Sequence, residues 1–97
     1  MKRVYLITNK SFYVDFEGVD HQIADYGCLP QMFTSIAKAK KSMMSTWEMY
    51  VGTFHYEVTK NYPNGRDDQA RLIEEFEMVN PTSGIRTIIS LWREWIS

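Results

Sequence analysis

The chain has 97 residues, a formal net charge of −1 and one cysteine, with three tryptophans, six tyrosines and five phenylalanines. This length indicates a single α+β domain over residues 1–97, because domains most often hold about 100–150 residues and rarely fewer than about 50. The aromatic content excludes a disordered chain, the lone Cys28 excludes an intramolecular disulfide, and the near-neutral charge disfavours nucleic acid as a partner.

No apolar segment is long enough for targeting or membrane insertion. The run from Val4 to Ile7 is shorter than the roughly 7–15 residues of a signal-peptide core. No stretch approaches the roughly 20 residues that span a bilayer. We therefore expect a soluble, cytoplasmic protein with no membrane partner.

The N-terminal third predicts a hairpin followed by a long loop. Residues 3–8 are rich in β-branched and aromatic side chains, and residues 12–17 alternate apolar with polar. The polar residues 9–11 between them suit a three-residue turn. Residues 18–32 have no period and contain Gly18, Gly27 and Pro30. They predict a surface loop, with a short strand or helical turn as the alternative.

Residues 34–51 predict the clearest helix. Thr34 or Ser35 can act as N-cap, and Gly52 suits a left-handed C-cap. The apolar side chains fall mostly on one stripe: Phe33, Ile36, Ala37, Met43, Met44, Trp47, Tyr50 and Val51. Residues 53–60 then alternate, which predicts a strand with one buried side. The sequence Tyr62-Pro63-Asn64-Gly65 predicts a turn.

The last third fits two interpretations. Residues 70–79 and 85–96 can each form a strand or a helix, joined by a five-residue connection at 80–84. The β-branched run around Ile88 favours strands. The favoured architecture is a two-layer sandwich, ββ-α-βββ, with one helix packed on one face of an antiparallel sheet. The alternative has a helical C-terminal third.

No motif indicates a reaction, a cofactor or a metal. Phosphate-binding glycine loops and the common zinc patterns are absent from the sequence. Asp20, His21, Asp25 and Cys28 gather in the 18–32 loop, where they could form a metal site or a thiolate–imidazole pair, also with His55. A solvated loop with a buried thiol is the favoured interpretation, so an enzyme is the least favoured hypothesis.

Charge is segregated along the chain. Lys38, Lys40 and Lys41 lie on the predicted helix, and residues 67–79 have a net charge of −4 that includes Glu74, Glu75 and Glu77. The two segments form solvated faces, or they steer a partner or a second copy by charge complementarity.

The segment near the C-terminus contains Trp92, Arg93 and Trp95, residue types enriched at interface hot spots. The alternative is that both tryptophans close the core. We expect a non-enzymatic protein that binds a protein partner or itself through these residues, steered by the charged ones. The second hypothesis is a nucleic-acid-binding regulator that uses the helix lysines with Lys2 and Arg3.

Overall fold

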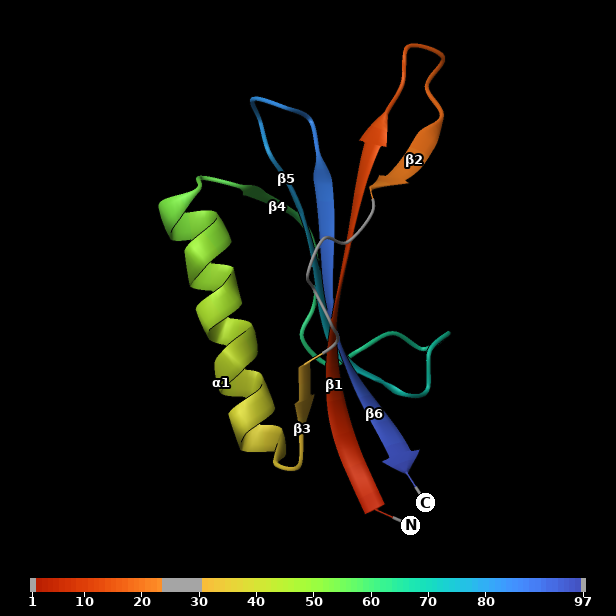
Figure 1. Cartoon of the computed structure of the whole chain (residues 1–97), viewed down its shortest axis with the longest axis vertical. Helices are drawn as coiled ribbons and strands as arrows, with labels where there is room; N and C mark the ends of the chain where they lie inside the picture. The colour runs from red at the N-terminus through yellow and green to blue at the C-terminus, as the bar shows by residue number, and fades with distance from the viewer. Residues whose placement is uncertain (1, 24–30, 97) are drawn as a thin grey trace.

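The computed structural model describes residues 2–23 and 31–96. Its elements are β1 (Lys2–Val14), β2 (Asp20–Ile23), β3 (Gln31–Phe33), α1 (Ile36–Trp47), the π-helix η1 (Glu48–Thr53), β4 (Glu57–Tyr62), β5 (Leu72–Val79) and β6 (Arg86–Ile96). An antiparallel sheet runs in the order β2-β1-β6-β5-β4, and β3 also pairs with β1. The helix covers one face of this sheet (Figure 1). The α+β sandwich is confirmed, with three strands before the helix where the sequence predicted two.

The predicted N-terminal hairpin at residues 9–11 is wrong, because β1 is one continuous strand. It pairs with β6 from Lys2↔Ile96 to Phe12↔Arg86. Two of these polar side chains make contacts from within β1: Asn9 Nδ2 donates to the hydroxyl of Tyr50 in η1 at 3.4 Å, and the hydroxyls of Ser11 and Thr87 are 3.0 Å apart. Long-range pairing therefore overrides the local turn preference of this segment.

The other edge of β1 is shared by the two short strands. β2 pairs with it from Ser11↔Ile23 to Val14↔Asp20, and β3 pairs with it from Tyr5↔Phe33 to Ile7↔Gln31. The expectation of a loop over residues 18–32 is therefore wrong at both ends, where the alternative of short strands holds. The centre of that segment, residues 24–30, lies outside the described residues.

The helix begins where the sequence predicts. Ser35 is the N-cap, and its hydroxyl accepts a hydrogen bond of 3.4 Å from the backbone N–H of Lys38. Its buried side chains are Ala39 and Met43, which join a core from β1, β5 and β6 made of Ile7, Phe76, Met78, Ile89 and Leu91. The predicted stripe is wrong at Ile36, Ala37 and Met44, which are exposed.

The predicted left-handed cap at Gly52 is also wrong. The helix continues as η1 through Thr53, and the positive φ occurs at His55, with φ 57°. Tyr50 and Val51 pack against the core in this last stretch. Gly52 therefore lies inside the helix and not at its C-cap.

The C-terminal third consists of strands, and the helical alternative is wrong. β5 pairs with β4 and with β6, and β6 also pairs with β1. The predicted turn before β5 is confirmed: Gly65 has a φ of +78° and its N–H donates to the Tyr62 carbonyl. The strand expected over residues 53–60 begins only at Glu57.

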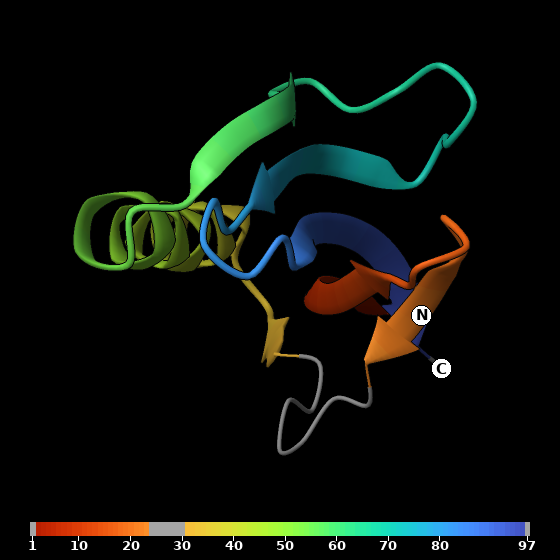
Figure 2. The ribbon, with the colours of Figure 1, turned by 90° about the horizontal axis from the view of Figure 1, so that it is seen from above.

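The face of the sheet opposite α1 is covered by a loop and a hairpin and not by a helix. The connection of residues 63–71 and the β1–β2 hairpin both lie on the side away from α1 (Figure 2). Val4 and Leu72 are buried but do not belong to the core beneath α1. The sheet is therefore packed on both faces. In the described residues no helix is long and apolar enough to cross a membrane.

Candidate interaction surfaces

The acidic side chains of β5 form a buried network. Glu75 and Glu77 are 7 % and 8 % exposed, and alternation along the strand turns them away from the α1 core that holds Phe76 and Met78. Oε2 of Glu75 accepts a 2.7 Å hydrogen bond from Ser90, and Oε1 lies 3.5 Å from Nε of Arg66. Buried carboxylates are stable only when paired in this way.

Glu77 joins three strands through the same network. Its Oε1 is 3.1 Å from Nε of Arg86, and its Oε2 accepts from the Thr59 hydroxyl at 3.1 Å. Arg86 then reaches β2, where its Nη2 donates to Asp20 at 2.9 Å. The expectation that Glu75 and Glu77 steer a partner from a solvated face is wrong, because both are buried and committed to the fold. Glu74, half-buried, lies on the opposite face.

The two C-terminal tryptophans have different environments. Trp92 is half-buried, and its indole N–H donates to the Thr8 hydroxyl at 2.9 Å. Trp95 is 51 % exposed and lies under the Arg3 guanidinium, 4.6 Å from its ring centroid. Arg93 is exposed. Trp92 therefore serves packing, while an interface role for Arg93 and Trp95 stays a prediction.

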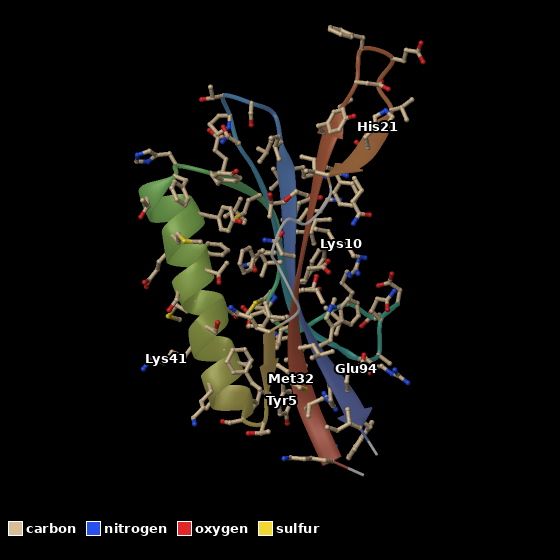
Figure 3. All side chains as sticks on the ribbon, viewed as in Figure 1. Tyr5, Lys10, His21, Met32, Lys41 and Glu94 are labelled. Atoms are coloured by element: carbon tan, nitrogen blue, oxygen red, sulfur yellow. The ribbon has the colours of Figure 1, made fainter. Side chains whose placement is uncertain are left out.

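The three helix lysines are exposed. Lys41 extends from the outer side of α1, as Figure 3 shows. Lys40 differs from the other two, because it is three and seven residues before Met43 and Trp47 and so shares their side of the helix. Within the described chain none of the three forms an ion pair with a carboxylate. They supply uncompensated positive charge.

The residues considered for metal or thiol chemistry do not converge where they are described. Asp20 pairs with Arg86, and His21 pairs with Asp15. Asp25 and Cys28 lie outside the described residues. Among residues 2–23 and 31–96, no three His, Cys, Asp or Glu side chains are grouped to hold a metal ion. His55 is exposed just before β4.

The most exposed apolar surface is at the end of the β1–β2 hairpin. Phe16 is 110 % exposed, and three further large apolar side chains near it are each about half exposed: Tyr13, Val14 and Val19. We call these four residues the tip patch. The hairpin projects beyond the rest of the sheet (Figure 1). Exposed apolar side chains gathered at one projecting turn are candidates for an interaction site.

The backbone beneath the tip patch is held by Asp15. Its Oδ1 accepts 2.9 Å hydrogen bonds from the N–H groups of Glu17 and Val19, and its backbone N–H donates to the Val19 carbonyl. Its Oδ2 is 2.6 Å from Nε2 of His21, whose ring stacks on Tyr13 with centroids 5.1 Å apart. The hydrogen bond with His21 and those with the backbone lower the pKa of Asp15. The tip is thus an ordered turn.

A groove lies between α1 and the β4–β5 end of the sheet. It has a volume of about 320 Å³ and is lined by Lys40, Met43, Met44, Trp47, Asn61, Pro63, Glu74 and Phe76. We call it the methionine groove. Met43 and Phe76 are buried in its floor, while Met44 is 65 % exposed at its edge. Trp47 and Phe76 meet edge to face, with centroids 5.0 Å apart.

Neither surface was predicted from the sequence, although each leaves a signal there. Phe16 lies within Asp15-Phe16-Glu17-Gly18, a turn-like sequence in which a large apolar side chain has no core to enter. Met43 and Met44 are adjacent, so both cannot face the same core. An apolar residue that its element cannot bury is the signal in both cases.

Comparison of the chain with protein-family models, with curated proteins and with solved structures finds no match.

Proposed function

We propose that this protein acts by binding a protein partner through the tip patch, without catalysing a reaction. The observation that carries the proposal is the position of Phe16, a fully exposed aromatic side chain at the end of a projecting hairpin. Aromatic residues are enriched at protein interfaces and among the few residues that dominate binding energy. Among the described residues, Phe16 is left fully exposed, so packing within one molecule gives no reason for a large apolar side chain at this position.

The order of the turn supports the same proposal. Asp15 and His21 hold the tip before any partner arrives. Binding by a flexible loop would lose conformational entropy, at roughly 0.5–1.5 kcal/mol for each immobilised side chain. A turn fixed in advance avoids part of this loss. The network therefore serves presentation of Phe16 as well as stability.

The experiment compares Phe16 with a second exposed phenylalanine, Phe54. Tagged wild-type chain, Phe16→Ser and Phe54→Ser are expressed in the native cell, and the proteins retained with each are quantified. Phe54 is 53 % exposed but lies outside both the tip patch and the methionine groove. We expect discrete proteins to be lost at least tenfold with Phe16→Ser and kept with Phe54→Ser.

One outcome of this experiment would contradict the proposal. If all retained proteins are the same for wild type and Phe16→Ser, while circular dichroism shows both folded, the tip patch is not the binding surface. A second, differently tagged copy of the chain is included in the quantification, so that self-association counts as binding.

A further inference from the structure

We infer that one partner of the tip patch is a second copy of this chain, whose methionine groove receives Phe16. This inference rests on the proposed function and adds the identity of the partner. The tip patch and the methionine groove are both apolar and have opposite shapes, because one projects and the other is hollowed. Their chemistry is complementary as well.

The charges around the two surfaces are opposite. Residues 13–20 contain no lysine or arginine, and because Asp15 pairs with His21 and Asp20 with Arg86, Glu17 is the acid that is left free there. α1 contains Lys38, Lys40 and Lys41 and no acidic residue, and Lys40 lines the groove together with Glu74 of β5. Glu17, beside Phe16, is exposed and has no ion pair with a described side chain. Complementary charge of this kind orients an encounter and fixes its register.

The size and lining of the groove suit one aromatic side chain. Its volume of about 320 Å³ is at the small end of the roughly 300–1,000 Å³ of ligand pockets. Methionine sulfur makes favourable contacts with aromatic rings, and flexible methionines adapt to an entering group. Trp47 adds a second ring, which can meet Phe16 edge to face as it meets Phe76.

One molecule cannot make this contact with itself. The hairpin lies on the side of the sheet away from α1, as Figures 1 and 2 both show. The contact is therefore heterologous, tip to groove, and each bound copy still offers one free tip and one free groove. Wild-type chains should form a concentration-dependent series of oligomers. A contact made by the tip patch alone buries less area than the roughly 1,200–2,000 Å² of a standard interface, so the association is weak.

The test separates the two halves of the contact. Phe16→Ser removes the tip and keeps the groove, and Met44→Glu places a like charge against the acidic tip and keeps the tip. Both positions are exposed, so folding should be unaffected. Light scattering on size-exclusion chromatography, from micromolar to millimolar concentration, gives the masses. Phe54→Ser is the matched control.

We expect wild type and Phe54→Ser to show a mass that rises with concentration and falls with added salt. Each tip or groove variant alone stays a monomer. Their equimolar mixture gives a dimer and nothing larger, because only one tip–groove pair is left intact. A wild-type monomer at every concentration would overturn the inference, as would oligomers that both variants leave unchanged. In either case, proteins lost only with Phe16→Ser would still support the proposed function with another partner.

Discussion

Oδ2 of Asp15 lies 2.6 Å from Nε2 of His21, and the same carboxylate accepts two backbone N–H groups through Oδ1. One side chain thus joins the turn to β2. Because a carboxylate only accepts hydrogen bonds, the imidazole donates in this pair. The rest of the tip depends on Asp15 remaining ionised.

The order of the tip should depend on pH through this residue. The pKa of Asp15 is lowered, first by the hydrogen bond with His21 and then by the backbone N–H of Val19. An unfolded aspartate titrates near about 3.9. The stabilisation is therefore present above that pH and is lost as the pH falls through the lower, folded pKa.

Amide hydrogen exchange at Glu17 and Val19 measures this dependence, after correction for the intrinsic effect of pH. We expect protection at neutral pH and its loss in strong acid. Asp15→Asn keeps an acceptor oxygen but does not titrate, so its smaller protection should not change with acid over that range. Wild-type protection that is equally insensitive to acid would contradict the role given to Asp15.

The buried acid network predicts unequal effects for two paired residues. Glu77→Ala removes the buried carboxylate that lies 3.1 Å from Nε of Arg86 and accepts from the Thr59 hydroxyl, and we expect the free energy of unfolding to fall by about 1–3 kcal/mol. Lys60 lies 3.9 Å from the same carboxylate and is largely exposed, so Lys60→Ala should change it by less than about 0.5 kcal/mol. Urea denaturation gives both values, and equal losses would refute the network.

The same substitution at two phenylalanines should change the free energy of unfolding by very different amounts. Phe76 is 1 % exposed at the floor of the methionine groove, and Phe76→Ala should lower the free energy of unfolding by about 3–5 kcal/mol. Phe16→Ala should change it by less than about 0.5 kcal/mol. Thermal unfolding distinguishes them. A large loss with Phe16→Ala would mean that this side chain serves the fold rather than a partner.

Gly65 is required by its turn. A Cβ there would clash with the Leu72 carbonyl oxygen, and the residue has a φ of +78°. Strain of this kind costs on the order of 1–3 kcal/mol, so Gly65→Ala should be destabilising by at least that amount. The control is Gly52 in η1, where an added Cβ would meet open space. Gly52→Ala should be neutral or stabilising, since alanine favours helix, and a similar loss at both would refute this account.

The sequence correctly predicts those elements whose local sequence signals agree with the pairing and packing of the folded chain. Ser35 as N-cap, the turn at Gly65 and the strands β5 and β6 are of this kind. Asn9 and Gly52 are of the other kind: each has a local preference, for a turn and for a helix end, that distant contacts override. For Asn9 those contacts are the β1–β6 ladder, and at Gly52 the helix continues through Thr53 as η1.

The candidate surfaces were less predictable than the fold. Charge counting grouped Glu75 and Glu77 with exposed residues, although alternation with Phe76 and Met78 places them together on the second face, where basic side chains cover them. Trp92 is half-buried and Trp95 is exposed, a difference that the sequence left open. Phe16 was read as part of a predicted strand, and only the position of the turn reveals it as the tip.

The most direct test of the account is a photo-cross-link from position 16. A benzophenone amino acid replaces Phe16 in one variant and Phe54 in another, and both are irradiated in the native cell. We predict discrete cross-linked protein species from position 16, absent from position 54, with the methionine groove of a second copy among the sites identified by mass spectrometry. Equal, diffuse labelling from both positions would contradict binding through the tip patch.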